Sequence, residues 1–161
     1  MEKKKYDKTY LNLIEKINDI AGIRIVCTLK DDIFFIRDLV KQIPDIHILK
    51  EKDYVTNPKE SGYSSYHMIV EVPVKLTQKT IYVKCEIQIR TLAMNFWATI
   101  EHSLNYKYKQ HIPEQLKEKL KRSADAAFRL DEEMLEIKDE IKDAQKLFEV
   151  KSHLISNIMN S

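Results

Sequence analysis

Glycine is scarce in this chain: Gly22 and Gly62 are the only two glycines among 161 residues. A phosphate-binding loop of the usual nucleotide-binding kinds needs several glycines, because its backbone approaches the phosphates closely. Such a loop is excluded, and any phosphate must be held by side chains. We expect Gly22 to permit close packing at a strand entry and Gly62 to form a turn.

Cysteines and long apolar runs are also few. Cys27 and Cys85 are the only cysteines. Both fall at apolar positions of predicted strands without metal-ligand spacing, so we interpret them as buried free thiols of a reducing compartment. No signal peptide or apolar run long enough to span a membrane is present, which predicts a soluble, cytoplasmic protein without a membrane partner.

The charges nearly balance, with 27 lysines and arginines against 25 aspartates and glutamates. This composition provides no general electrostatic affinity for RNA, DNA or an anionic membrane. An anionic ligand must therefore be held by a local cluster of cations. The length of 161 residues corresponds to about one domain.

The middle of the chain carries the clearest pattern. Apolar and polar residues alternate over 81–89, which is typical of a strand with one buried face. Glu86, Gln88 and Arg90 therefore share the polar face, which on spacing alone suits a binding site or a plain solvated surface equally well. A helix follows, capped by Thr91. Its predicted core stripe consists of Leu92, Phe96, Ile100, Leu104 and Tyr108.

The preceding segments alternate between helix and strand, which predicts an α/β or α+β domain with a mixed sheet. The helix over 31–43 is expected to be capped by Asp31 or Asp32 and closed by Pro44. The turn formers in 52–63 predict a loop. The expected elements are helices at 7–17, 31–43 and 92–108 and strands at 20–29, 46–49, 64–74 and 81–89, the last two strands forming an antiparallel hairpin.

The pattern of the C-terminal part predicts a long helix that begins at Pro113, with Glu114 as the next residue. Its apolar residues are spaced alternately three and four apart, a heptad seam of about three repeats. Packing on its own domain and oligomerisation explain this seam equally well. We divide the chain into a core at 1–110 and a helical extension at 111–161. The seam residues are Ala127, Leu130, Met134, Ile137, Ile141, Ala144 and Phe148.

Asp19 and Glu86 are the candidate metal ligands. Each belongs to a predicted strand or to a strand entry, so one sheet could bring the two carboxylates together. Mg²⁺ takes oxygen ligands, and it usually binds one or two carboxylates together with substrate phosphates. The sequence therefore suggests a magnesium site.

Cations and one aromatic ring accompany these carboxylates. The cations would neutralise phosphate oxygens, and the ring of Tyr63 could stack on a base. A nucleotide substrate follows from this interpretation. The alternative is that Arg24 and Glu86 form an ion pair on the sheet face and that Tyr63 only packs its own loop. The cations are Arg24, Lys52, Lys59, His67 and Arg90.

Several segments resemble the synthetase domain of the RelA/SpoT family, and in particular the small alarmone synthetases, which consist of that domain and C-terminal helices. They are DIAGIRI at 19–25, KDYVTNPKESGYSSYH at 52–67 and EIQIRTLAMNFWATIEHSLNYKY at 86–108, and RLDEEM at 129–134 is also similar. The resemblance implies a GTP pyrophosphokinase of the stringent response. This enzyme transfers pyrophosphate from ATP to the 3′-hydroxyl of GDP or GTP, giving AMP and the alarmone ppGpp or pppGpp. It also implies a nucleotidyltransferase-like mixed sheet flanked by helices, and a homotetramer.

The resemblance further implies roles for single residues. Asp19 and Glu86 would be catalytic and bind Mg²⁺, with Glu86 as the general base toward the 3′-hydroxyl. Arg24 would bind the ATP phosphates. Tyr63 would stack on guanine, and Asn95 would read the edge of the base. The other contacts to GDP or GTP would come from Lys52, Lys59, His67 and Gln88.

One family feature is missing ahead of DIAGIRI. Relatives carry a basic segment there with a Gly-Arg-x-Lys motif that helps to hold the ATP phosphates, whereas MEKKKYDKTYLNLIEKIN supplies lysines without that motif. The chain is then a fragment or a divergent member. As written, it is expected to bind guanine nucleotide better than ATP and to be weakly active or inactive. The alternatives are a regulatory subunit that binds guanine nucleotide, alarmone or single-stranded RNA, and a nucleotidyltransferase that releases pyrophosphate.

Overall fold

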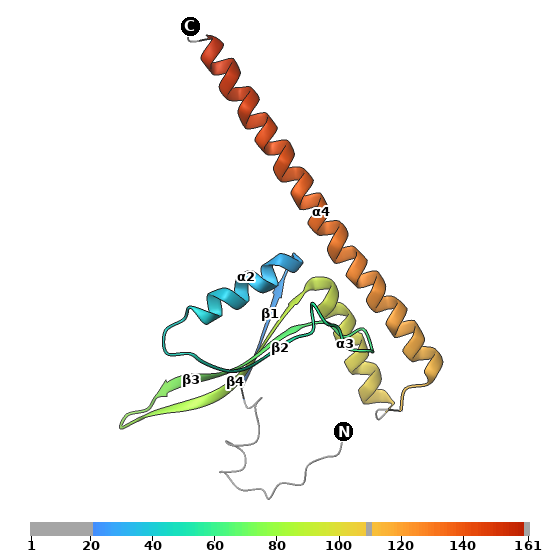
Figure 1. Cartoon of the computed structure of the whole chain (residues 1–161). Helices are drawn as coiled ribbons and strands as arrows, with labels where there is room; N and C mark the ends of the chain where they lie inside the picture. Colours follow the sequence, from blue (N-terminus) through green and yellow to red (C-terminus); the bar gives the residue numbers. More distant parts are fainter. Residues whose placement is uncertain (1–20, 109–110, 160–161) are drawn as a thin grey trace, which may run out of the picture.

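The computed structural model describes residues 21–108 and 111–159, the last ten as helix backbone only. Asp19 and the predicted helix at 7–17 lie outside the described residues. In the described ranges, no helix is both long and apolar enough to cross a membrane. In chain order (Figure 1), the elements are β1 (Ala21–Cys27), α2 (Lys30–Lys41), β2 (His47–Asp53), β3 (Tyr66–Lys75), β4 (Thr80–Thr91), α3 (Leu92–Lys107) and α4 (Glu114–Met159).

The four strands form one mixed sheet in the order β1-β4-β3-β2. Strands β3 and β4 form the antiparallel hairpin that the sequence predicts, and the N–H of Leu76 donates to the carbonyl of Lys79 at 2.8 Å in its turn. Strand β2 pairs antiparallel with β3, whereas β1 runs parallel to β4. The expected mixed α/β or α+β sheet is confirmed.

One face of this sheet forms the main core. The alternation predicted for β3 and β4 is confirmed, because Met68, Val70, Ile87 and Ile89 are buried there. Helix α2 contributes Ile33 to the same core. The remaining buried apolar residues of this core are Val40, Val55, Tyr66, Cys85 and Met94. Since neighbouring residues of a strand point to opposite faces, the polar residues of β3 and β4 are left on the other face.

Both thiols are free, as predicted, but only Cys85 is buried, and Cys27 is half-buried. Partial burial, helped by nearby Asp32, raises the pKa of the Cys27 thiol to about 11. The thiol of Cys27 also donates to the carbonyl of Arg90 at 3.1 Å. A protonated, partly covered thiol of this kind is a structural residue and a poor nucleophile.

The bounds expected for α2 and β2 are wrong. Helix α2 spans Lys30–Lys41 rather than 31–43, and Leu29 is its N-cap instead of Asp31 or Asp32. Asp32 lies inside the first turn, where its carboxylate accepts from the N–H of Leu29 at 3.2 Å, so it caps the helix from within. Strand β2 extends into the predicted loop as far as Asp53, because pairing with β3 satisfies its backbone groups.

The core stripe predicted for α3 is also wrong. Leu92 and Phe96 are exposed, Phe96 by 72%, and the helix instead buries Met94, Trp97 and Ala98. Side chains four residues apart rotate by about 40° around the helix at each step, so the five predicted residues could not share one face. The predicted cap is confirmed, since the hydroxyl of Thr91 accepts from the N–H of Met94 at 3.1 Å.

Helix α4 begins directly after Pro113, close to its predicted start. Its N-terminal half contacts α3 and the end of β4. The indole N–H of Trp97 donates to the carbonyl of Leu120 at 2.8 Å, and the hydroxyl of Thr91 donates to the buried carboxylate of Asp131 at 2.7 Å. The helix then extends away from the sheet (Figure 1). From Leu130 onward the described side chains of its heptad seam are exposed.

Candidate active site

The predicted site residues form a row across the polar face of the sheet. Lys52 on β2 pairs with His67 on β3, and His67 pairs in turn with Gln88 on β4. Gln88 pairs with Arg24 on β1, so the row crosses all four strands. Paired residues point to the same side of a sheet. The prediction that these polar faces meet on one sheet is therefore confirmed by the strand register.

Glu86 lies on the same face, two residues before Gln88 on β4. Its carboxylate accepts from Nδ1 of His67 at 2.9 Å and from the amide of Gln88 at 2.9 Å. Burial favours a higher pKa for Glu86, but the hydrogen bonds from Gln88 and His67 and the charge of Lys52 outweigh it. The pKa of Glu86 is lowered overall, and the carboxylate is ionised at neutral pH.

The imidazole of His67 is a neutral hydrogen-bonding group. Burial lowers its pKa and outweighs the raising effect of Glu86, while Arg90 and Lys59 lower the pKa further. The contact between His67 and Glu86 is thus a hydrogen bond to a carboxylate rather than an ion pair. The alternative pair of Arg24 with Glu86 is wrong: among the described ion pairs, Glu86 contacts only His67.

The loop between β2 and β3 places Lys59 and Tyr63 beside this row. The N–H of Lys59 donates to the carbonyl of Tyr63 at 3.0 Å, and the N–H of Gly62 donates to the carbonyl of Lys59 at 2.8 Å. Gly62 has φ of +89°, a conformation that favours glycine, as the predicted turn requires. The ammonium of Lys59 lies 4.5 Å from the centroid of the Tyr63 ring. A cation and an aromatic ring therefore lie together next to the His67 position of the row.

Gly22, in contrast, is not tightly packed against any residue in 21–108 or 111–159. It pairs with Glu86, but a Cβ atom added there would lie 3.9 Å from the nearest carbonyl oxygen, which is an ordinary contact. Within the described part of the chain, the expectation of close packing at this strand entry is wrong, because the backbone of the parallel partner strand leaves room for a methyl group.

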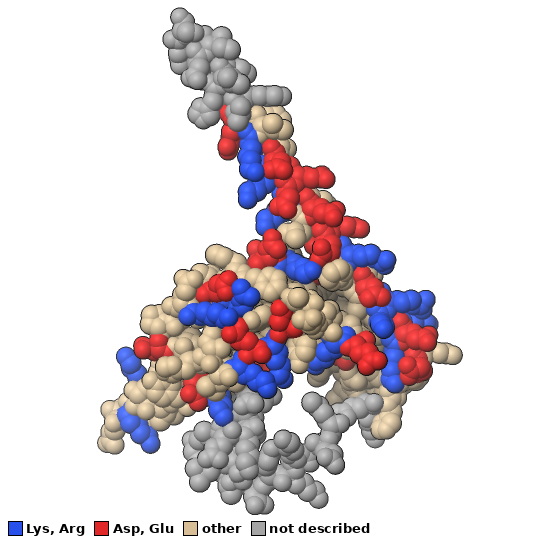
Figure 2. Space-filling model, in the orientation of Figure 1, with Lys and Arg blue, Asp and Glu red and all other residues tan. Residues whose placement is uncertain are grey.

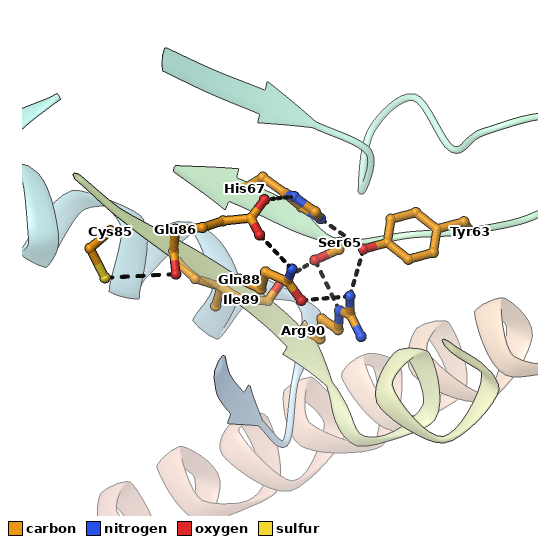
Figure 3. A network of polar contacts seen from close by, with 8 residues as sticks. All are labelled: Tyr63, Ser65, His67, Cys85, Glu86, Gln88, Ile89 and Arg90. Atoms are coloured by element: carbon orange, nitrogen blue, oxygen red, sulfur yellow. Dashed lines mark hydrogen bonds and ion pairs between the residues drawn. The ribbon is translucent and has the colours of Figure 1, made fainter. Parts of the chain in front are cut away.

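Arg90 differs most from its predicted role. Neutralising phosphate, the role predicted for Arg90, requires an accessible guanidinium, yet the residue is only 5% exposed. Its guanidinium donates to the hydroxyl of Ser65 at 3.1 Å, to the hydroxyl of Tyr63 at 2.5 Å and to the side-chain carbonyl of Gln88 at 2.8 Å (Figure 3). Arg90 is thus a buried residue that holds the side chains of Tyr63 and Gln88 in place by hydrogen bonds.

Ser65 is a residue that the sequence interpretation missed. It is fully buried, and its hydroxyl accepts from Arg90. A signal was available, since Ser65 stands two residues before His67 and therefore falls on the same polar face of the predicted strand.

Asn95 lies on α3, outside the strands that carry the row. Its side-chain oxygen is buried without a hydrogen-bond partner among the described residues. Leaving a buried acceptor unpaired costs about 1–3 kcal/mol. This oxygen is consequently free to accept from a ligand donor, and its predicted role toward the guanine edge stays a prediction.

The described residues contain no cluster of three metal-binding side chains. Glu86 is ionised and keeps 22% of its side chain exposed, so it has the chemistry and access to supply one oxygen ligand. Asp19, the second predicted ligand, lies outside the described residues. One or two carboxylates with substrate phosphates are the usual Mg²⁺ environment, and Glu86 fits such a site.

Comparison with known proteins places these elements in a family. A profile described as the region found in RelA / SpoT proteins matches residues 1–111. GTP pyrophosphokinase YjbM of Bacillus subtilis (strain 168) is 49% identical over 148 residues, covering 92% of this chain and 70% of that protein. GTP pyrophosphokinase YwaC of the same strain is 50% identical over 127 residues, covering 79% of this chain and 60% of that protein.

A solved structure agrees with these relatives. The small alarmone synthetase 1 of Bacillus subtilis, bound to its product pppGpp, matches with a TM-score of 0.77 and 51% identity. The match covers 81% of this chain and 68% of that one. The family and the fold expected from the sequence motifs are both confirmed.

Proposed function

Because this chain belongs to the RelA/SpoT family, we propose that it is a GTP pyrophosphokinase. It transfers pyrophosphate from ATP to the 3′-hydroxyl of GDP or GTP and releases AMP and ppGpp or pppGpp. The observation that carries the proposal is the row of Arg24, Gln88, His67 and Lys52 beside the ionised carboxylate of Glu86. The relatives YjbM and YwaC are GTP pyrophosphokinases, which supports this assignment. We also propose a cytoplasmic location, which is where ATP and guanine nucleotides are available as substrates.

The strand order supplies the geometry of the transfer. Arg24 stands on the edge strand β1, and Lys52 stands on the opposite edge strand β2. Glu86 lies between these edges on β4. A donor held at Arg24 and an acceptor held at Lys52 would therefore meet over Glu86. Transfer of a phosphoryl-type group depends mainly on such positioning and on charge neutralisation.

Glu86 acts as the general base in this proposal. An ionised carboxylate within hydrogen-bond reach of the 3′-hydroxyl can take its proton as the new bond to phosphorus forms. Around the acceptor, Tyr63 stacks on guanine and Asn95 accepts from the edge of the base with its unpaired oxygen. The phosphates and ribose of the acceptor contact Lys52, Lys59, His67 and Gln88.

Mg²⁺ is the proposed cofactor, with Glu86 and Asp19 as its protein ligands. When bound, it would supply positive charge to the phosphate oxygens of ATP. The ionised state and partial exposure of Glu86 support this assignment.

Nucleotide separation tests the proposed function directly. The protein is incubated with Mg²⁺, labelled ATP and either GDP or GTP, and the products are resolved by ion-exchange chromatography. AMP together with a more highly phosphorylated guanine nucleotide is the expected result, and a sample without guanine nucleotide is the control. Release of pyrophosphate would identify a nucleotidyltransferase instead. Guanine-nucleotide binding without any product would favour the regulatory subunit.

We also propose that the exposed seam of α4 joins copies of this chain, in a homotetramer. The described seam residues from Leu130 to Phe148 are exposed, and Lys, Arg, Asp and Glu side chains intermingle along the helix (Figure 2). Apolar heptads flanked by mixed charges favour helix association.

Light scattering is expected to give a multiple of the 19.1 kDa chain mass, and Ile137→Asp is expected to reduce the assembly. The control Glu136→Gln lies outside the seam and should leave the mass unchanged. A monomer at micromolar concentration would remove this proposal.

A further inference from the structure

Five side chains of the candidate site form a closed ring of hydrogen bonds (Figure 3). Starting from Glu86, the ring passes through His67 at 2.9 Å and Tyr63 at 2.8 Å. It continues from Tyr63 to Arg90 at 2.5 Å and to Gln88 at 2.8 Å, and Gln88 returns to Glu86 at 2.9 Å. Each member therefore touches two others, and none can rotate without breaking a contact.

Arg90 determines the direction of every hydrogen bond in this ring, because a guanidinium has donors and no acceptor. The hydroxyl oxygen of Tyr63 accepts from Arg90, so its own hydrogen is free to point to Nε2 of His67. Nε2 must then be the acceptor of the neutral imidazole, and the hydrogen of His67 lies on Nδ1, where it donates to Glu86.

The path from Arg90 through Tyr63 and His67 to Glu86 is one arm of the ring, and the path through Gln88 is the other. The direction of the hydrogen bonds in this second arm is also set by Arg90. The side-chain oxygen of Gln88 accepts from Arg90, which turns the amide NH₂ toward Glu86. The two arms end on different oxygens of the Glu86 carboxylate. Both arms start at one guanidinium nitrogen of Arg90, and the other end of that guanidinium is held by Ser65. The orientation of the carboxylate is thus set by a buried anchor on the same strand.

We propose that the hydroxyl of Tyr63 and the guanidinium of Arg90 are positioning groups that hold Glu86 in its catalytic orientation. Tyr63 then has two tasks: its ring face binds the guanine base, and its hydroxyl orients His67 and, through it, Glu86. Binding of the acceptor base is thereby coupled to the placement of the general base. This inference rests on the proposed function, since it concerns the same site.

Tyr63→Phe separates the two tasks, because phenylalanine keeps the stacking ring and loses the hydroxyl. The expected result is a kcat reduced by about 10- to 100-fold, since small misplacement of a catalytic group has effects of this size. The KM for GDP should change by less than about threefold, because the ring still stacks. Tyr54→Phe is the matched control: this neighbouring hydroxyl makes no hydrogen bond in the described part of the chain, so kcat should stay unchanged.

Arg90→Lys tests the anchor. A single ammonium cannot reproduce the planar set of contacts to Ser65, Tyr63 and Gln88, so a similar loss of kcat is expected. Because both groups act through one ring, the double variant with Tyr63→Phe should have a kcat only slightly below that of the less active single variant. If the fold-losses of kcat in the two single variants instead multiply in the double variant, the two groups act independently and the ring is not their common cause. A melting curve of each variant shows whether the fold is retained.

An activity-independent readout separates this inference from the proposed function. Long-range ¹H–¹⁵N spectra distinguish the tautomers of histidine, and His67→Gln assigns the signal. The expected spectrum shows the hydrogen on Nδ1 in the unaltered protein and a mixture of tautomers in Tyr63→Phe. A hydrogen on Nε2 in the unaltered protein would overturn the ring. Absence of AMP formation with the Nδ1 tautomer present would refute only the proposed function. An active protein with an unchanged kcat in Tyr63→Phe would refute only the inference.

Discussion

Replacing Glu86 by glutamine is expected to lower the rate of AMP formation by about 10²- to 10⁴-fold, the usual contribution of a general base. The amide has nearly the shape of the carboxylate, but it cannot take a proton from the 3′-hydroxyl. It also places an NH₂ group or a carbonyl where the carboxylate accepts from both His67 and Gln88. Only one of those two hydrogen bonds can be kept.

The measurement compares initial rates at saturating ATP and GDP with nucleotide affinity from calorimetry. Affinity for GDP should be largely retained, because the acceptor contacts lie on other residues. Glu71→Gln is a matched control, since Glu71 lies on the same face of β3 but pairs with Lys84, away from the row. Unaltered synthesis in Glu86→Gln would mean that another group accepts the proton.

Gly62→Ala is expected to be the most damaging substitution in the loop between β2 and β3. The backbone of Gly62 has φ of +89°, which strains any residue with a Cβ atom by about 1–3 kcal/mol. The new methyl group would also lie 2.3 Å from Cβ of Ala124 on α4. Overpacking of this kind costs about another 1–3 kcal/mol. Either the domain loses stability or the loop that carries Tyr63 moves away.

Chemical denaturation of Gly62→Ala, together with its kcat, tests this expectation. The compensating variant Ala124→Gly removes the opposing methyl group, at a cost of about 1 kcal/mol for glycine in a helix. The double variant should therefore be more stable than the sum of the two single effects. Strictly additive losses would show that backbone strain alone, without the steric contact, makes glycine necessary at this position.

Several features followed from local patterns alone. Alternation in β3 and β4 separated a core face from a polar face, because a strand has a period of two wherever it lies. The same rule identified His67, Glu86 and Gln88 as residues of the polar face. Thr91 was recognisable as a helix cap because capping depends on residues within one turn. The motifs were long enough to identify the family.

Other features depended on packing between distant segments. Which face of α3 is buried was decided by α4 and by the loop at 54–65, so Trp97 is buried and Phe96 is exposed. The exposure of Arg90 was also not encoded in its strand position. Tyr63 and Ser65, from the preceding loop, cover its guanidinium. Alternation assigns a side chain to a face, but it does not say what covers that face.

The sequence by itself determined the strands and helices, the polar character of one sheet face and the family. Only the tertiary structure decided the register that aligns Lys52, His67, Gln88 and Arg24 in one row, and the closure of the hydrogen-bond ring around Glu86. The physical reason is the range of the interactions. Periodicity and capping act within a few residues, whereas a row across four strands requires hydrogen-bonded pairing of segments more than 60 residues apart.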